Sequence, residues 1–185
     1  MEQLPIGHYW KTPFIWEPGC PEPASTTSLR FEAADPDWLQ DAMARVMSDS
    51  LDESDQFAVK QLGAQQAAQE LLAIPTDYFE VPAAWWQTAF DREGNAIGFV
   101  LPVTFVDQSR WRSGLPQGTI YYMGVLPQYR SHGFGQELLD QATRTFIQAK
   151  CWRIFCDTGT SNLPMVGAFR KAGYKELPPW QRALS

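Results

Sequence analysis

The chain has 185 residues, 44% of them hydrophobic and 19% charged, with a formal net charge of −6 at pH 7. This composition is typical of a single globular domain and argues against a disordered chain. The acidic balance argues against a nucleic-acid-binding protein, which needs positive charge to neutralise phosphates. The longest apolar stretch, residues 96–106, contains a proline and is too short to cross a bilayer. We therefore expect neither a nucleic acid nor a membrane as partner.

Three features of the sequence bear on location and metal content. The first residues lack the basic start and apolar run of a secretory signal. Three cysteines, an odd number, do not form a disulfide framework, and Cys151 and Cys156 have no histidine or cysteine neighbours at zinc-binding spacing. We expect a cytoplasmic protein without a metal, in which Cys156 is a small core residue of a buried strand.

Residues 1–26 contain five prolines among aromatic side chains. Proline at this density excludes a helix interior, so we expect an extended arm, with room for a short strand, laid on a domain of residues 27–185. Two roles for the arm stay open, covering a substrate pocket or forming a subunit interface. The oligomeric state stays open as well, a homodimer included.

The next part of the chain predicts a strand at residues 27–31 and then two helices. Asp35 and Pro36 supply an N-cap and a first helical residue for a helix of about three turns. A polar loop covers residues 48–55, and a second helix is expected over residues 56–73, because a proline follows it.

After residue 80 the pattern becomes rich in β-formers. The remaining elements expected in chain order are strands 84–90 and 96–106 around a hairpin loop, strand 118–126, helix 136–150, strand 152–156, helix 163–171 and a last strand in the tail. This order predicts one α/β domain with a mixed sheet and helices packed against it.

The most informative segment is residues 121–136, which pass from a strand through a short loop into a helix. Gly133 and Gly135 at the start of the helix let the backbone approach a ligand, and the first helical N–H groups have no partner within the helix. Such a helix start suits a pyrophosphate, and Arg130 and His132 would add side-chain donors. The segment matches neither a Walker loop nor a dinucleotide fingerprint, and an ordinary tight turn is the alternative.

Residues 130–135, Arg-Ser-His-Gly-Phe-Gly, resemble the Arg/Gln-x-x-Gly-x-Gly/Ala acyl-CoA loop of the GNAT superfamily of N-acetyltransferases. The preceding residues 123–127, Met-Gly-Val-Leu-Pro, look like the bulged fourth strand of that family. Further on, Asn162 together with residues 169–174 is similar to the family's Asn-x₆-Tyr-x-Lys-x-Gly-Phe ending.

The resemblance covers residues 27–177 by element order and residues 118–175 by motif. It implies one GNAT-like domain, with a mixed, mostly antiparallel central sheet that is flanked by helices and splayed between strands 118–126 and 152–156. The pantetheine arm of acetyl-CoA would lie in that gap and pair with backbone like an added strand. Gly124 suits the bulge that would open the gap.

The resemblance also implies a set of residues that bind acetyl-CoA. Backbone groups of Val125 would hold the thioester arm and stabilise the oxyanion, and N–H groups near the glycines would hold the pyrophosphate. Asn162 would bind the pantetheine arm, cap the helix that follows it, or do both. The full set is Val125, Leu126, Arg130, Ser131, His132, Gly133, Phe134, Gly135, Gln136 and Asn162.

Proton transfer is the step for which the sequence departs from the family. Phe169 stands where many members carry a tyrosine that acts as general acid, and phenylalanine cannot donate a proton. Counting with period two from Val125 puts Tyr121 on the same strand face, where it would orient a water relay or simply pack in the sheet. Tyr174, Ser161 and solvent are the other candidates for the missing acid. Tyr121 and Tyr174 are our candidate catalytic residues.

The resemblance implies an acceptor site framed by the loop between the first two helices, here residues 48–55, and by the connection before strand 118–126. The loop carries four acids and would attract a cationic amine. Asp52, Glu53 and Trp111 are the candidate acceptor-binding residues, and a solvated, helix-capping loop is the alternative. Residues 119–185 contain eight basic and four acidic side chains and so carry +4, which leaves −10 for the preceding part. This asymmetry fits a polyanionic donor opposite a cationic acceptor.

The expected function is therefore an N-acetyltransferase that moves the acetyl group of acetyl-CoA to a primary amine of a small molecule or protein by direct attack. A non-catalytic acyl-CoA-binding or regulatory domain of the same fold is the alternative, and a plain scaffold domain is a third reading.

Overall fold

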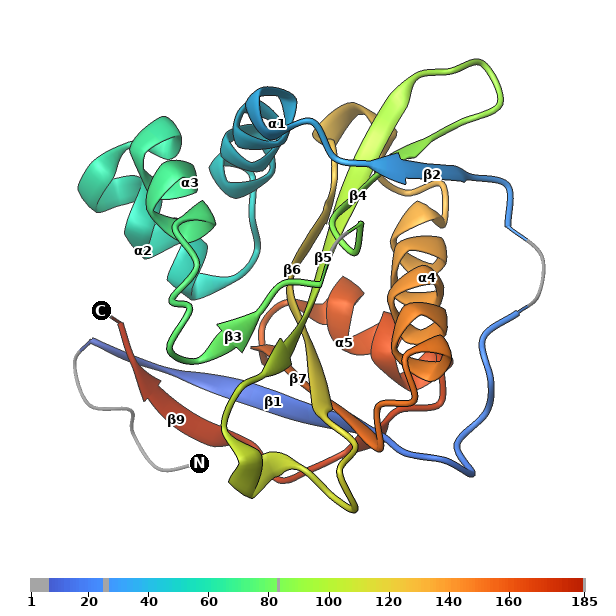
Figure 1. Ribbon diagram of the computed structural model, residues 1–185. Coiled ribbons are helices and arrows are strands. Elements are labelled where there is room, and N and C mark those ends of the chain that lie inside the picture. Colours follow the sequence, from blue (N-terminus) through green and yellow to red (C-terminus); the bar gives the residue numbers. More distant parts are fainter. Residues whose placement is uncertain (1–6, 25–26, 83, 185) are drawn as a thin grey trace.

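The computed structural model describes residues 7–24, 27–82 and 84–184, which form a sheet with helices on both faces (Figure 1). The strands are β1 (His8–Trp16), β2 (Arg30–Ala33), β3 (Phe79–Glu80), β4 (Gln87–Phe90), β5 (Ala96–Phe105), β6 (Gln117–Val125), β7 (Arg153–Gly159), β8 (Lys175–Glu176) and β9 (Trp180–Ala183). The helices are α1 (Pro36–Ser48), α2 (Glu53–Leu62), α3 (Ala64–Leu72), α4 (Phe134–Gln148) and α5 (Leu163–Lys171).

The strands of the described residues lie in the order β2-β4-β5-β6-β7-β1-β8, with β3 paired to β5 and β9 to β1. Every pairing is antiparallel except that of β6 with β7, which is parallel. The structure thus confirms the α/β fold with a mixed, mostly antiparallel sheet.

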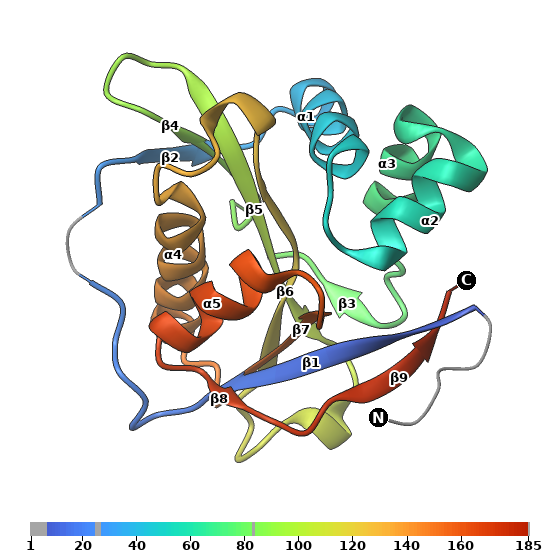
Figure 2. The same ribbon diagram turned by 180° about the vertical axis from the view of Figure 1, so that it is seen from behind.

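Helices α1 to α3 cover one face of the sheet, and α4 and α5 cover the other (Figures 1 and 2). Met43 of α1 and Ala68 of α3 share one core cluster with Phe99 of β5. Phe146 of α4 and Phe169 of α5 belong to a second cluster on the opposite face. The strand side chains point alternately to the two faces, so each core is formed by one face of the sheet and its helices. No helix of the described residues is both long and apolar enough to span a membrane.

Helix α1 begins as the sequence predicts, because the Asp35 side chain accepts a hydrogen bond from the backbone N–H of Trp38 at 2.9 Å. The single helix expected over residues 56–73 is wrong. Gly63 has φ = 78° and separates α2 from α3, since this left-handed conformation cannot continue a right-handed helix.

The sheet contains a β-bulge at a different place from the one that the sequence suggested. The β5–β6 register shifts between Leu101 and Pro102, which face Tyr122 and Ile120, so Tyr121 is the extra residue. Proline has no backbone N–H to donate to a neighbouring strand, and a bulge relieves this defect. Gly124 instead pairs regularly with Phe99 of β5.

Residues 8–16 of the N-terminal arm form β1, which lies inside the sheet between β7 on one side and β8 and β9 on the other. Lys11 of β1 pairs with Gly159 at the end of β7. The arm thereby brings its side chains to the end of β7. The division at residue 26 itself stays a prediction.

Candidate functional site

Strands β6 and β7 separate soon after they start. Their parallel pairing consists of Gln117 with Arg153 and Gly118 with Ile154. Just beyond it, the backbone N–H of Ile120 donates to the Sγ atom of Cys156 at 3.5 Å, a contact with a side chain rather than with the neighbouring strand. A cleft of about 1610 Å³ lies over the separated strands and is lined by both of them. This is the splay that the resemblance implies, and it opens one edge of β6 to the cleft.

The start of α4 lines this cleft and has an open, uncapped backbone. Ser131 has φ = 64° and Gly133 has φ = 84°, so the chain curls in front of the helix. Gly133 is the N-cap residue, and no side chain of the described residues caps the helix there. A Cβ atom added to Gly133 or Gly135 would meet nothing within 4 Å. The space around these two glycines is therefore open. Of the first-turn N–H groups, that of Gln136 donates to the Gly133 carbonyl oxygen at 3.0 Å. A helix start without a side-chain cap is the kind of backbone that can bind an anion.

The predicted donor-site residues divide into two groups. Most of them line the cleft: Val125, Arg130, Ser131, Gly133, Phe134, Gly135, Gln136 and Asn162. Leu126 is instead a core residue, 2% exposed. His132 lies on the outer side of the loop, where its Nδ1 is 2.7 Å from the Arg130 carbonyl oxygen and its ring stacks on Phe134.

The Arg130 side chain binds the protein rather than pointing into the open part of the cleft. Its Nε donates to the Val125 carbonyl oxygen at 3.2 Å and its Nη2 to that of Val46 at 3.3 Å. Its Nη1 donates to both the carbonyl oxygen and Oδ2 of Asp49, at 2.7 and 2.6 Å. The guanidinium thus joins the end of β6 to the end of α1.

Asn162 lies at the N-cap position of α5 and lines the cleft. Its carbonyl oxygen accepts from the N–H groups of Met165 and Val166 at 3.1 and 3.0 Å. Its side chain makes no capping hydrogen bond within the described residues. The capping alternative is therefore not what the structure has, and the amide is free for another role.

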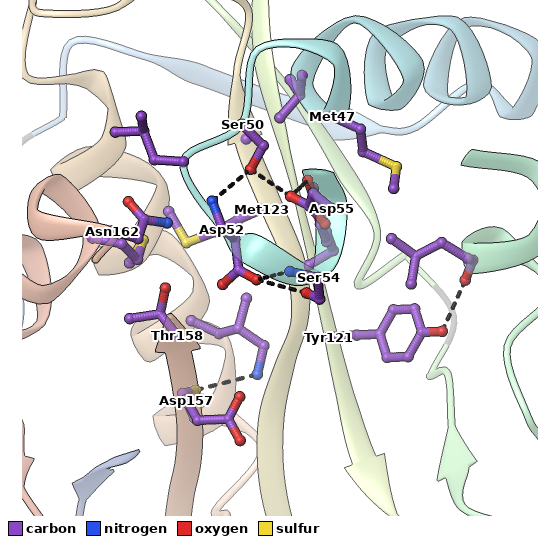
Figure 3. Close-up of a pocket in the computed structure, with 18 of the residues that line it drawn as sticks. Met47, Ser50, Asp52, Ser54, Asp55, Tyr121, Met123, Asp157, Thr158 and Asn162 are labelled. Carbon is purple, nitrogen blue, oxygen red and sulfur yellow. Dashed lines mark hydrogen bonds between the residues drawn. The ribbon is translucent and has the colours of Figure 1, made fainter. Parts of the chain in front are cut away.

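Asp52 lies in the cleft, where it joins the start of α2 to the end of β7 (Figure 3). Its Oδ1 accepts from the N–H and the hydroxyl of Ser54 at 3.0 and 2.6 Å, and its Oδ2 accepts from the Gly159 N–H at 2.8 Å. Burial would raise the pKa of this carboxyl group, but these donors and the nearby Lys11 ammonium lower it. Asp52 is therefore a fixed, ionised group.

Lys11 is a cleft residue that the sequence did not reveal. Its Nζ donates to Asp157 Oδ1 at 2.7 Å, and the two side chains are only 12% and 17% exposed. Burial alone would lower the Lys11 pKa, but Asp157 and Asp52 raise it, so the ammonium stays charged. The only available signal was a single cation within a proline- and aromatic-rich segment.

Asp55 and Tyr122 form a second group that sequence reasoning missed. Asp55 is 7% exposed, and its Oδ2 accepts from the Ser50 hydroxyl at 2.6 Å and from the Tyr122 hydroxyl at 2.7 Å. Burial, together with the Asp52 charge, raises the Asp55 pKa. Tyr122 lies on the α1–α3 side by regular alternation with Gly124. The expectation that Tyr121 shares the strand face of Val125 is wrong, because the bulge moves Tyr121 to the α1–α3 side, whereas Val125 packs on the α4 side.

The two candidate catalytic tyrosines lie in different surroundings. Tyr121 lines the cleft, and its hydroxyl donates to the Leu71 carbonyl oxygen at 2.8 Å. Tyr174 is 4% exposed, shares a 2.7 Å hydrogen bond with the Thr143 hydroxyl and packs edge-on against Phe169. Phe169 lines the cleft and stacks on Phe14. Tyr174 thus lies in the core behind this wall.

The other acceptor candidates lie beside the cleft rather than in its lining. Glu53 Oε1 accepts from the Ser161 hydroxyl at 2.6 Å, and its Oε2 is buried without a hydrogen-bond partner among the described residues. Trp111 donates from its indole nitrogen to the Phe105 carbonyl oxygen at 2.9 Å. Cys156 is 3% exposed, and burial raises its pKa to about 12, which is the environment of a core residue. No group of three or more His, Cys, Asp or Glu in the described part of the chain could hold a metal ion.

Comparisons with known proteins agree with this geometry. A model of the acetyltransferase (GNAT) family matches residues 47–174. No curated protein matches the chain by sequence. A GNAT-family acetyltransferase from Colwellia psychrerythraea is 14% identical with a TM-score of 0.60, covering 96% of this chain and 56% of its own. A GCN5-related N-acetyltransferase from Sphaerobacter thermophilus is 12% identical with a TM-score of 0.53. The match covers 95% of the present chain and 52% of that protein.

An aminoglycoside N-acetyltransferase solved in complex with CoA is 17% identical with a TM-score of 0.51, covering 84% of this chain and 93% of its own. The chain spans about half the length of the first two structures. At these identities the likeness establishes the fold.

Proposed function

The chain belongs to the GNAT acetyltransferase family, and from this premise we propose that it transfers the acetyl group of acetyl-CoA to the primary amine of a cationic acceptor by direct attack. The observation that carries the proposal is the parting of β6 from β7 after Gly118 and Ile154, which leaves the rest of β6 unpaired with β7 up to the loop that leads into the uncapped start of α4. The gap can take an extended pantetheine arm, and the helix start can take its pyrophosphate.

The donor half of the cleft supports acetyl-CoA in two ways. The curled backbone from Ser131 to Gly133 and the first turn of α4 offer N–H groups to a phosphate without crowding it. The free edge of β6 at Val125 offers backbone groups to the amides of pantetheine, in the manner of an added strand. The Asn162 amide lies on the other wall of the cleft and would contact the same arm.

The acceptor half supports a cationic amine. Asp52, Asp55 and Asp157 all interact with one ammonium group, that of Lys11. Three carboxylates around one cation leave this part of the wall negative, which would attract a second ammonium group. Asp52 is the best-placed partner for it, because its low pKa keeps it ionised.

Two measurements on the purified protein test the proposal. Calorimetric titration with acetyl-CoA should give one binding site, and a thiol-release assay over an amine panel should give turnover that is greatest for polycationic amines. The panel includes an aminoglycoside, the substrate class in the name of one structural relative. Neutral amines of similar size are the matched control.

The outcomes separate the competing functions. Binding without thiol release on any amine would favour a non-catalytic acyl-CoA-binding domain, which the phenylalanine at position 169 allows. Absence of acetyl-CoA binding would overturn the donor assignment altogether.

A further inference from the structure

Resting on the proposed function, we propose that Asp55 is the catalytic residue that accepts the proton of the acceptor amine. Asp52 lies beside it as a permanent anion, and Tyr122 is a positioning residue that holds the Asp55 carboxyl group in place.

The first argument is where Asp55 lies. It belongs to the first turn of α2, yet it is 7% exposed and lines the same cleft as Met123 and Val125 of β6. The acetyl end of a thioester arm bound along the β6 edge would therefore lie in the cleft that Asp55 lines. A carboxylate buried at the wall of a ligand cleft has a high desolvation cost, which is typical of functional groups.

The second argument is how the carboxyl group is held. Among the described residues, both of its hydrogen bonds end on Oδ2, from Ser50 at 2.6 Å and from Tyr122 at 2.7 Å. Ser50 is itself fixed, because its hydroxyl oxygen accepts from the Asp52 N–H at 3.1 Å. The side chain is thus locked, and Oδ1 is the oxygen that remains for a ligand.

The third argument is that the pKa values of two neighbouring carboxyl groups, Asp52 and Asp55, shift in opposite directions. Donors and the Lys11 ammonium lower the pKa of Asp52, whereas burial and the Asp52 charge raise the pKa of Asp55. The groups that face Asp55 are Ser50 and Asp52 from the loop before α2, Tyr122 from β6 and Lys11 from β1. When the pKa values of two adjacent acids are pushed apart, the acid with the raised pKa is suited to exchange protons and the other to bind charge.

The alternatives within the cleft are less suitable. The Tyr121 hydroxyl already donates to the Leu71 carbonyl oxygen, Tyr174 lies in the core behind Phe169, and Phe169 has no proton to exchange. Asp55 is therefore the group that remains as proton acceptor, and without a tyrosine at position 169 the proton for the thiolate comes from the amine nitrogen itself.

The proton balance runs through Asp55 as follows. The acceptor ammonium gives one proton to Asp55 Oδ1, and the neutral nitrogen attacks the thioester carbonyl carbon. The C–N bond forms and the C–S bond breaks, the second N–H proton goes to the departing thiolate, and Asp55 returns its own proton to water. One ammonium and one thioester thus give one amide, one thiol and one released proton.

The experiment is the pH dependence of kcat/KM for acetyl transfer in four variants. Asp55→Asn should lower the rate by about 10²-fold or more and remove the acidic limb of the profile. Tyr122→Phe should move the acidic limb to higher pH, because the lost hydrogen bond favoured the ionised form of Asp55. Asp52→Asn should move it to lower pH, because the lost charge disfavoured that form. Asp41→Asn, an exposed carboxylate on α1, is the matched control and should leave the profile unchanged.

Folding and donor binding are checked separately, by thermal unfolding and by calorimetry with acetyl-CoA, and should be unchanged in Asp55→Asn. If the two substitutions merely disturbed packing, both would lower the maximal kcat/KM. Neither would then shift the acidic limb of the pH profile, so shifts of opposite sign in Tyr122→Phe and Asp52→Asn indicate a change in the Asp55 pKa. If Asp55→Asn keeps the acidic limb, or the two shifts have the same sign, Asp55 is not the proton acceptor although the acetyltransferase stands. If the wild-type protein transfers acetyl to no amine, both the function and the catalytic role fall.

Discussion

Arg130 and Asp49 join the loop before α4 to the end of α1, and so the two halves of the cleft to which we assign the donor and the acceptor. The Arg130 Nη1 atom donates to the backbone carbonyl oxygen of Asp49 at 2.7 Å and to its Oδ2 at 2.6 Å. Arg130 belongs to the loop before α4, and Asp49 ends α1 and begins the loop that carries Asp52. The pair therefore sets the position of the acidic loop relative to the phosphate site.

The first prediction concerns Arg130→Met, which keeps the apolar stem and removes the guanidinium. We expect the KM for the acceptor to rise several-fold, because the loop that carries Asp52 loses its anchor. The Kd for acetyl-CoA should change by less than about 3-fold, because the guanidinium donates to protein groups. Arg144→Met, on the outer face of α4, is the control. A large loss of acetyl-CoA affinity with an unchanged acceptor KM would mean that Arg130 binds phosphate after all.

The second prediction concerns Gly135→Glu, in the first turn of α4. A Cβ atom there meets nothing within 4 Å, so the fold should tolerate the side chain. A carboxylate near a helix start stabilises the helix, whereas beside a bound pyrophosphate it repels the ligand. We expect a Tm equal to or slightly above that of the wild type, together with an acetyl-CoA Kd raised by at least about 10-fold. Gly135→Ala should keep both the fold and the binding, and unchanged binding in the Glu variant would contradict the phosphate site.

The third prediction distinguishes Asp52 from Glu53, which the sequence suggests equally as acceptor-binding residues. Asp52→Asn should raise the KM for a cationic acceptor by about 10-fold or more, since a hydrogen-bonded charge is worth roughly 1.5–3 kcal/mol. Glu53→Gln should change the KM less than about 2-fold, because Glu53 binds Ser161 beside the cleft rather than in its lining. Steady-state kinetics on a cationic and a neutral amine measure this difference. Equal effects of the two changes would remove Asp52 from acceptor recognition.

The fourth prediction concerns the contact of α1 with β6. A Cβ atom on Gly124 would come within 2.6 Å of Val46 Cγ1, so Gly124→Ala should destabilise the protein by about 1–3 kcal/mol. Val46→Ala removes the obstructing methyl groups, and the double variant should be more stable than the sum of the single effects implies. Urea unfolding at equilibrium measures all three variants. If the two changes in the free energy of unfolding simply add in the double variant, the methyl group added at position 124 does not clash with Val46.

The parts of the site that could be predicted from the sequence are those set by local chemistry. Gly133 and Gly135 are two positions apart in the chain, so their spacing alone predicts the glycine-containing turn into α4 that the structure has. Asp35 and Pro36 likewise fix the start of α1 through contacts within one turn. The fold followed from the order of such local elements together with the family motifs.

The parts that could not be predicted depend on distant contacts. Asp55 meets Tyr122 across 67 positions of the chain, and nothing local indicates that contact. The bulge opposite Pro102 moves Tyr121 to the face of the sheet on which Tyr122 already lies. Gly63 was overlooked as a helix break because the residues on both sides of it favour helix. Arg130 looked like a phosphate ligand because nothing in the sequence indicates that Asp49 and two backbone carbonyl groups would bind it.

The pairing of β1 with strands from the other end of the described sequence bears on how the protein folds. Lys11 and Asp157 lie 146 positions apart, and all three strands that pair with β1 come from the last part of the chain. During synthesis, β1 leaves the ribosome before β7, β8 and β9, and its aromatic residues have no partner strand until these emerge. Such non-local pairing is slow and exposes an edge to aggregation in the meantime. The Lys11–Asp157 ion pair therefore cannot form before β7 has been synthesised, and a chain that stops short of β7 lacks it altogether.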